Sequence, residues 1–301
     1  MHSDSAGAAQ NDQLVWFDRT GKRLGTVGEP GQHVRLALSP DEKQVAVDRS
    51  ALQPGDIWLI ELARGISTRF TFDSKDDTAP VWSPDGRTIG FASNREGAYD
   101  VYRKISSGAG KDELLLKSAI PKFPSDWSPD GRFLLYYEIN PKTKYDLWVL
   151  PDPGGAPGDK KPIPFLRTEF NEILGAFSPD GKWIAYQSDE SGNYEVYVQT
   201  FPSTGAKWQV SKGGGTHPRW RRDGKELFYL GGRKMTAVEV KIGATFQGGN
   251  PQPLFDTSIT NSFVRYAVTR DGQRFLFPAS MGESGTTPVT VVINWTAGIK
   301  R

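Results

Sequence analysis

The chain has 301 residues and carries 37 Lys and Arg against 35 Asp and Glu, so its formal net charge at pH 7 is only +2. That balance offers neither the basic field typical of nucleic-acid binding nor an acidic tail. No apolar run of about 18 residues occurs, so no segment is predicted to cross a membrane. The polar start MHSDSAGAAQNDQ lacks the apolar core of a signal peptide. With no Cys, disulfides and thiolate chemistry are excluded.

The composition favours many short strands joined by turns, because aromatic residues make up 12% of the chain and 33 Gly and 21 Pro are present. Helical periodicity of useful length is absent. We expect residues 1–12 to be a disordered or loosely ordered N-terminal segment. Residues 13–301 are expected to form a single domain.

A tetrapeptide of the type Ser-Pro-Asp-Gly recurs along the whole chain at spacings of 43 to 50 residues. A period of this size with strand-like content is typical of propeller blades that contain four strands each. The sequence therefore predicts an all-β fold, a six-bladed β-propeller of four-stranded antiparallel blades. The six copies align on Asp41, Asp85, Asp130, Asp180, Asp223 and Asp271.

Each turn is followed by an alternating stretch, and period-2 spacing places its apolar residues on one sheet face. One apolar column consists of Val45, Ile89, Leu134, Ile184, Leu227 and Phe275. Third strands are predicted at 56–60, 100–102, 146–150 and 195–198. Weaker fourth strands follow at 67–72, 112–116 and 207–211.

The two ends of the chain are expected to share a blade. Residues 14–27 resemble the third and fourth strands of a blade, whereas 264–279 supply a first and a second strand. Such sharing would close the ring without a covalent bond and leave no open edge. A further strand-like stretch at 290–295 exceeds the four strands that the shared blade needs. The sequence does not decide which terminus contributes the extra strand.

The repeated aspartate is interpreted as part of a turn. In Ser-Pro-Asp-Gly the Ser can cap backbone N–H groups, Pro presets φ, and Asp and Gly tolerate the last two positions of a type I turn. Six symmetric carboxylates at one rim would be an odd catalyst, whereas six blades need six turns. The acids before the third strands are likewise expected to have a shared structural role; they are Asp56, Asp100, Asp146 and Glu195.

The segment PVWSPDGRTIGFASNREGAYDVY, residues 80–102, closely resembles the repeats of TolB-like propellers, and weaker copies cover most of the chain. The opening LVWFDRTGKRLGTVGEPG and the closing NWTAGIK look more narrowly like the propeller found C-terminal to bacterial serine/threonine protein kinases. This resemblance implies a sensing or protein-interaction module in the extracytoplasmic part of a membrane-anchored parent. No kinase motif occurs in this chain, and the fold alone implies no activity.

A search for catalytic chemistry finds little. The related prolyl-oligopeptidase enzymes need a G-x-S-x-G nucleophile elbow, which is missing, and a hydrolase domain of about 200 further residues. The histidines His2, His33 and His217 do not form a zinc motif. Residues 73–77 lack the ligand order of a calcium loop. We therefore expect no cofactor and assign no metal ligands, although calcium or another divalent cation in the axial channel, as in six-bladed lactonases and phosphotriesterases, stays open.

Function is better sought where the repeat is broken. The first strand of each blade lines the channel, and a column of small apolar residues there is interrupted by Asp126 and Arg219. Buried charges are costly unless paired or solvated. We therefore hypothesise a mixed-charge ligand pocket at the channel mouth; a water-lined channel of mutually satisfied charges is the alternative. The predicted pocket comprises His33, Arg35, Asp126, Glu172, His217, Arg219 and Arg265.

The leading functional prediction is a non-catalytic, monomeric binding propeller. Arginine forks in the predicted pocket suit carboxylate or phosphate groups, so the expected partners are a protein, or a small anionic ligand or peptide. The alternative is a hydrolase or lyase that uses a divalent metal in the axial channel. Whether the chain is an enzyme stays open, and the sequence leans against it.

Overall fold

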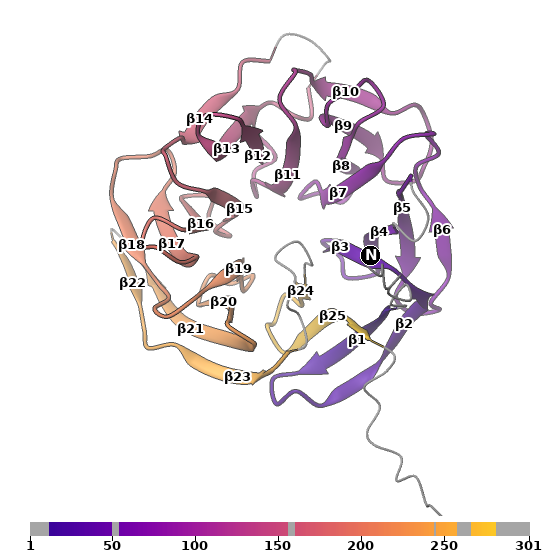
Figure 1. The fold of residues 1–301 in the computed structure, drawn as a ribbon. Coiled ribbons are helices and arrows are strands. Elements are labelled where there is room, and N and C mark those ends of the chain that lie inside the picture. Colours follow the sequence, from indigo (N-terminus) through magenta and orange to yellow (C-terminus); the bar gives the residue numbers. More distant parts are fainter. Residues whose placement is uncertain (1–11, 50–53, 156–159, 244, 258–265, 281–301) are drawn as a thin grey trace, which may run out of the picture.

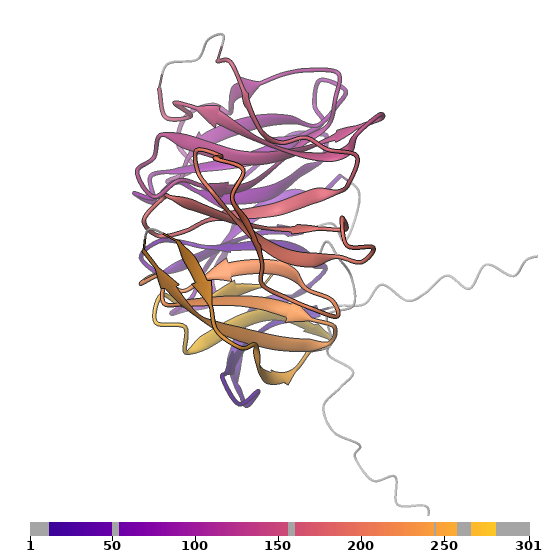
Figure 2. The same cartoon turned by 90° about the vertical axis from the view of Figure 1, so that its left-hand side faces the viewer.

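In the computed structural model six β-sheets stand around a common axis (Figure 1), and an edge-on view shows the strands running roughly between the two faces of the ring (Figure 2). The described residues are 12–49, 54–155, 160–243, 245–257 and 266–280. Within these ranges there is no α-helix, and so no described helix is long and apolar enough to span a bilayer. The predicted all-β, six-bladed architecture is confirmed.

Five blades are built from consecutive strands. Blade 1 contains β3 (His33–Leu38), β4 (Gln44–Arg49), β5 (Asp56–Glu61) and β6 (Ser67–Arg69). Blade 2 contains β7 (Asp77–Trp82), β8 (Thr88–Ser93), β9 (Asp100–Ile105) and β10 (Glu113–Leu116). Blade 3 contains β11 (Lys122–Trp127), β12 (Phe133–Asn140), β13 (Lys144–Pro151) and β14 (Ile163–Leu166). Blade 4 contains β15 (Glu172–Phe177), β16 (Trp183–Ser188), β17 (Glu195–Thr200) and β18 (Lys207–Gln209).

Blade 5 departs slightly from the four-stranded pattern. Its strands are β19 (Thr216–Trp220), β20 (Glu226–Gly231), β21 (Lys234–Ile242), β22 (Phe246–Gly248) and β23 (Gln252–Asp256). Both β22 and β23 pair with β21, each along a different part of that long strand. The fourth strand of this blade is therefore divided into two pieces.

Blade 6 is assembled from both ends of the described chain, as predicted. It contains β24 (Ala267–Val268) and β25 (Arg274–Ser280) from the C-terminal side, and β1 (Asp12–Asp18) and β2 (Arg23–Gly31) from the N-terminal side. The strand order is β2-β1-β25-β24. The expected N-terminal segment lies outside the described residues except for Asp12, with which β1 begins, and the surplus strand at 290–295 lies outside them too.

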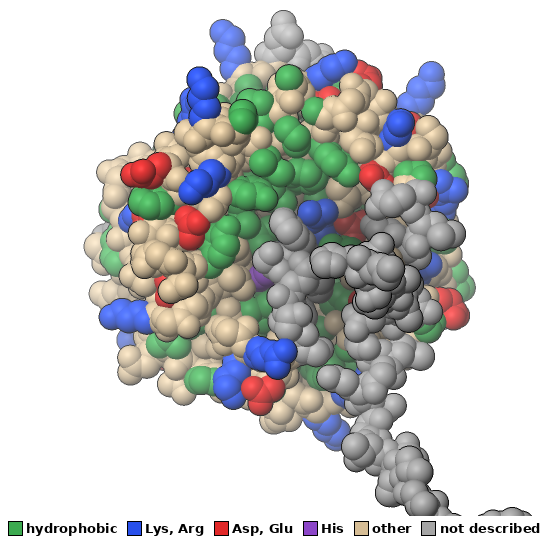
Figure 3. All heavy atoms as spheres, viewed as in Figure 1, with side chains coloured by type: hydrophobic (Ala, Val, Ile, Leu, Met, Phe, Trp, Pro, Cys, Tyr) green, Lys and Arg blue, Asp and Glu red, His purple; other side chains and the backbone are tan. Residues whose placement is uncertain are grey.

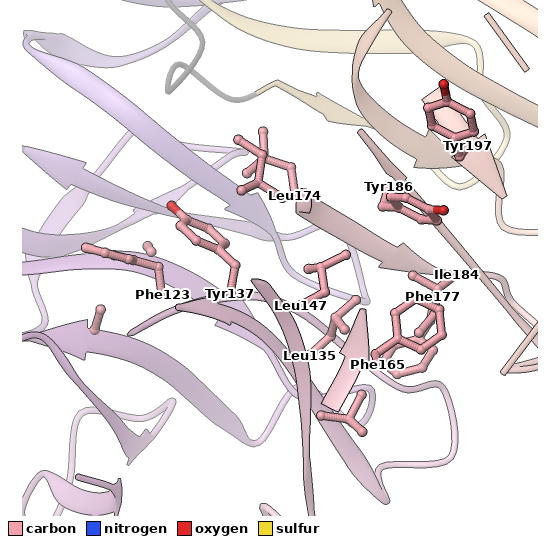
Figure 4. Close-up of a cluster of buried hydrophobic side chains, with 14 residues drawn as sticks. Phe123, Leu135, Tyr137, Leu147, Phe165, Leu174, Phe177, Ile184, Tyr186 and Tyr197 are labelled. Atoms are coloured by element: carbon pink, nitrogen blue, oxygen red, sulfur yellow. The ribbon is translucent and has the colours of Figure 1, made fainter. Parts of the chain in front are cut away.

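The hydrophobic core lies between neighbouring blades. The predicted column from Val45 to Phe275 is fully buried in every blade. Figure 4 shows one such contact, in which Leu135 and Leu147 of blade 3 meet Phe177 and Ile184 of blade 4. Because one face of each sheet is covered only by the next blade, a blade cannot bury its apolar surface alone.

The turn aspartates act as predicted. In blade 2, Ser83 Oγ donates to Asp85 Oδ1 at 2.6 Å, and Asp85 Oδ1 accepts from the backbone N–H of Arg87 at 3.0 Å. The bond from Ser83 is the main cause that lowers the pKa of Asp85. Equivalent Ser or Thr to Asp bonds exist in blades 1, 3, 4 and 6. These carboxylates therefore hold the turns in place.

The acids at the starts of the third strands also make local bonds, which supports their predicted structural role. Asp100 Oδ1 accepts from the backbone N–H of Ser118 at 2.9 Å. Glu195 accepts from the hydroxyl of Ser211 at 2.5 Å. Each acid thus ties the start of a third strand to the segment that follows the fourth strand of the same blade.

Replacing Ser83 with Ala should destabilise the propeller through a single turn. Ser83 is buried, and its hydroxyl also accepts from the backbone N–H of Thr88 at 2.9 Å, so the variant loses two hydrogen bonds. We expect the free energy of unfolding in urea to fall by about 1–2 kcal/mol. The exposed Ser107, changed to Ala, should stay within about 0.5 kcal/mol of wild type. Equal stability of the two variants would contradict the structural role of the turn.

Candidate functional site: two ends of an axial channel

A β-bulge in the first strand divides the channel into two levels. The pairing register with the second strand shifts in blades 1 to 5, midway along each first strand. At this position Ala79, Leu174 and His217 have φ values of 55°, 55° and 58°, which are unusual for residues other than Gly. Residues before the bulge lie on the side of the loops that join second to third strands, which we call the loop side. Residues after it lie on the side of the Ser-Pro-Asp-Gly turns, which we call the turn side.

Polar side chains hold the bulges in place. Gln187 of blade 4 accepts from the backbone N–H of His217 in blade 5 at 2.9 Å. Asp48 accepts from the backbone N–H of Arg35 at 2.6 Å. Such bonds compensate for backbone conformations that are otherwise costly.

On the loop side, Arg35 lies at the channel mouth. Its Nη1 donates to Thr78 Oγ1 at 2.6 Å and lies 3.8 Å from Asp48 Oδ2. Its guanidinium also lies over the ring of Phe123, 5.4 Å from the ring centroid. Arg35 therefore links blades 1, 2 and 3 beside the channel.

The two predicted histidines in the described chain are buried beneath this surface. His33 is 1% exposed, and burial, together with the positive field of Arg49, lowers its pKa to about 4. His33 is therefore neutral at pH 7. His217 is 2% exposed, and its carbonyl accepts from the hydroxyl of Tyr266 at 3.0 Å.

Glu172 forms an unusual pair of buried carboxyl groups with Asp146. The two side chains come from β15 and β13 in adjacent blades, and neither residue is more than 2% exposed. Burial raises the pKa of Glu172 to about 7; the hydrogen bond from Thr168 opposes this rise and the charge of Asp146 adds to it. At the equivalent place between blades 2 and 3 the partner of Asp100 is Lys122, a cation. Glu172 thus meets a like charge at the position where Asp100 meets the cation Lys122.

On the turn side, Asp126 and Arg219 line one cavity of about 260 Å³ to which all six blades contribute. Asp126 Oδ2 accepts from the backbone N–H of Phe177 in the next blade at 2.7 Å. In blades 2 and 5 a Trp stands at the position of Phe177, and its indole N–H donates to the preceding blade, as Trp220 does to the carbonyl of Ala176 at 3.1 Å. The Asp126 carboxylate therefore provides an inter-blade bond where the Trp is missing.

The structure thus distributes the predicted pocket over two levels. His33, Arg35, Glu172 and His217 lie at or before the bulge, on the loop side, whereas Asp126 and Arg219 lie after it. Arg265 lies outside the described residues. Asp126 and Arg219 line the same cavity, and the role of the whole set as a ligand site stays a prediction.

Two further groups of residues were missed in the sequence. The first is a tyrosine row, which consists of Tyr99, Tyr145 and Tyr194 and occupies one repeat position directly before the third-strand acid of blades 2, 3 and 4. The second is the pair Arg222 and Arg270, which replace the turn Pro in blades 5 and 6. The tyrosine row is visible in the repeat alignment as recurring Tyr-Asp or Tyr-Glu pairs. The two arginines are visible there as turns that depart from Ser-Pro-Asp-Gly.

All three members of the tyrosine row are half-buried. The ring centroids of Tyr99 and Phe123 are 4.9 Å apart, those of Phe123 and Tyr137 5.3 Å, and those of Tyr137 and Tyr145 5.9 Å. Burial is the main cause that raises the pKa of Tyr194 to about 12, and the charges of Asp189 and Tyr145 contribute. Tyr99 and Tyr145 of the row therefore pack against the aromatic rings of Phe123 and Tyr137. Figure 3 shows hydrophobic side chains gathered on this face over β11 and β15.

Comparison with known proteins agrees with this architecture. Residues 12–148 match the sequence model of the TolB beta propeller domain family. A putative TolB from Agrobacterium tumefaciens has a TM-score of 0.71 at 18% identity and covers 91% of this chain and 99% of its own. TolB from Acinetobacter baumannii has a TM-score of 0.61 at 18% identity and covers 90% of this chain and 64% of its own. The fold is therefore that of a six-bladed β-propeller, and the N-terminal part of the chain, residues 12–148, is similar to the TolB beta propeller domain family.

Further similarities show the range of proteins that resemble this chain. An oligogalacturonate lyase in complex with manganese has a TM-score of 0.57 at 13% identity, over 92% of this chain and 81% of the lyase. The uncharacterized peptidase YuxL of Bacillus subtilis is 27% identical over 48% of this chain and 27% of its own length. Protein Atu1656 of Agrobacterium fabrum is 24% identical over 54% of both chains. The chain thus spans about a quarter to a half of these curated relatives.

The buried carboxyl pair predicts a specific dependence of stability on pH. The pKa of Glu172 rises from an ordinary value of 4.5 to about 7 on folding, so the native state binds this proton more tightly than the unfolded state. Its stabilising contribution is complete below pH 4.5 and is lost as the pH rises through 7. Glu172→Gln keeps an acceptor for Thr168. Near pH 8 its free energy of unfolding in urea should exceed that of wild type by about 1–3 kcal/mol.

The exposed Glu239 provides the control, since Glu239→Gln should keep the wild-type slope of stability against pH. The prediction would be wrong if Glu172→Gln and wild type showed the same slope between pH 5 and about pH 8.

Proposed function

We propose that this propeller is a non-catalytic module that binds an extended segment of a partner protein across the loop-side mouth of its channel. The observation that carries this proposal is the tyrosine row beside Arg35. Tyr and Arg are enriched at the centres of protein interfaces, because each buries a large area and still offers a polar group. The row supplies three such side chains from consecutive blades.

The geometry suits a chain better than a compact ligand. Tyr99, Tyr145 and Tyr194 follow the curve of the ring from blade 2 to blade 4, so a ligand that touches all of them has to be extended. The guanidinium of Arg35 is packed on Phe123 at the inner side of the mouth, near Tyr99 and Tyr145. It can supply donors to backbone carbonyls or to a carboxylate of the bound segment.

The proposal also covers the cellular location, the parent protein and the oligomeric state of the module. The resemblance to TolB-like repeats and the TolB neighbours support an extracytoplasmic location and a role as a sensing or interaction domain. A kinase-type, membrane-anchored parent and a monomeric state are expectations from the sequence, and they are carried here as parts of the proposal.

The test uses a phage-displayed library of short random peptides selected on the wild-type propeller, followed by fluorescence anisotropy on the enriched peptides. Tyr145→Ala should weaken their binding by about tenfold or more, as expected for an interface centre. Tyr145→Phe should lose much less, because it keeps the ring. Phe72→Ala removes a 66% exposed aromatic ring that follows the fourth strand of blade 1 and does not belong to the tyrosine row, and this variant should bind like wild type.

Tyr194→Ala serves as a second variant if Tyr145→Ala folds poorly. Peptides that bind both alanine variants as tightly as wild type would exclude the tyrosine row as the binding surface.

The alternative function is a metal-dependent hydrolase or lyase, and its support is the shared fold with the manganese-bound lyase. Among the described residues, no group of three or more His, Cys, Asp or Glu side chains is placed to hold a metal ion. Thermal unfolding during stepwise addition of Mn²⁺, Ca²⁺ or Zn²⁺ discriminates between the two functions. We expect no saturable rise in Tm, and a saturable rise with one of these ions would favour the enzyme.

A further inference from the structure

The turn-side cavity is lined by none of the residues of the tyrosine row. The second residue of each Ser-Pro-Asp-Gly turn lies on the rim of this cavity. In blades 1 to 4 this residue is a proline, namely Pro40, Pro84, Pro129 or Pro179. In blades 5 and 6 it is Arg222 and Arg270. The rim is therefore apolar over four blades and cationic over two adjacent ones.

A third arginine lies on the same sector. Arg219 of β19 lines the cavity together with Arg222 and Arg270. Within the part of the chain that the structure describes, none of the three has a carboxylate oxygen within 4.0 Å, although Arg221 between them forms ion pairs with Asp223 and Glu226. Two of the three donate to backbone carbonyls, Arg219 to Pro218 at 3.0 Å and Arg270 to Pro40 at 3.5 Å.

The Asp126 carboxylate in the cavity does not neutralise the positive charge of the three arginines. Asp126 contributes one carboxylate, and its Oδ2 already accepts from the backbone N–H of Phe177 at 2.7 Å. Glu42 accepts from the backbone N–H of Arg270, which leaves the guanidinium charge of that residue in place. Among the described residues that line the cavity, three arginines thus stand against the one carboxylate of Asp126.

The remaining walls strengthen the attraction for an anion. Trp82, Trp127 and Trp220 line the cavity beside the prolines, and each is less than 10% exposed. Apolar walls with one sign of charge concentrate an electrostatic field, and arginine forks match carboxylate and phosphate geometry. The volume of about 260 Å³ lies below the usual range for drug-sized ligands, which suits a small molecule better than a folded partner.

We propose that the turn-side cavity binds a small anion that carries two or more carboxylate or phosphate groups, held by Arg219, Arg222 and Arg270. This site goes beyond the proposed peptide-binding function, because it lies on the opposite face of the ring and uses none of the same side chains. Two acidic groups are needed because the three arginines come from two blades.

Isothermal titration calorimetry on the whole chain at low ionic strength tests the site with two probes, tricarballylate and inorganic pyrophosphate. At least one probe should bind saturably, and the double variant Arg222→Gln/Arg270→Gln should weaken that binding by about tenfold or more. Which probe binds more tightly assigns the site to carboxylates or to phosphates. Binding should also weaken steeply with added salt, because the attraction is electrostatic.

The matched control is Arg87→Gln/Arg132→Gln, which removes two exposed arginines next to the turns of blades 2 and 3 without altering the cavity. It should bind like wild type. If the double variant of the site melts at a lower temperature than wild type, Arg219→Lys decides, since it keeps the charge but loses the fork and should bind several-fold more weakly. Absence of binding by both probes, or equal losses in the site and control variants, would overturn the proposal.

Discussion

The antiparallel pairing of β1 with β25 is the contact on which the whole ring depends. Every other blade is continuous in sequence, but blade 6 exists only because residues from the two ends of the described chain pair from Asp12 with Ser280 to Asp18 with Arg274. The apolar face of each blade is covered by its neighbour, so an open ring would expose the faces at the break. The N-terminal half of blade 6 packs against blade 1 through Leu14 and Val27, which extends the core across the closure.

The positions of the strands could be predicted because they follow from local chemistry. The turn tetrapeptide and the period-2 alternation after it are both short-range signals, and they repeat in each blade. In blade 5 these local signals do not predict the outer strand. Its degenerate turn still located β20, but the division of its outer strand into β22 and β23 depends on the length of β21, which no turn signal marks.

The candidate sites could be predicted only in part, for a physical reason. The bulge in the first strands of blades 1 to 5 changes which way the following residues face, and no glycine marks its positive-φ position, which is occupied by Ala79, Leu174 and His217 in blades 2, 4 and 5. Counting back from the turn in steps of two therefore placed residues of two levels in one pocket. The tyrosine row was overlooked because the search followed charge, whereas the row is neutral.

The geometry of the shared blade has a mechanical consequence. In the antiparallel ladder between β1 and β25, Asp12 and Ser280 are paired at the same end, where β1 begins and β25 ends. A force that pulls the chain apart at these two points would load the hydrogen bonds one pair after another, as when a zipper is opened, and not all at once in shear. The blade that closes the ring is therefore also the one through which tension between the two ends of the described chain would open it first.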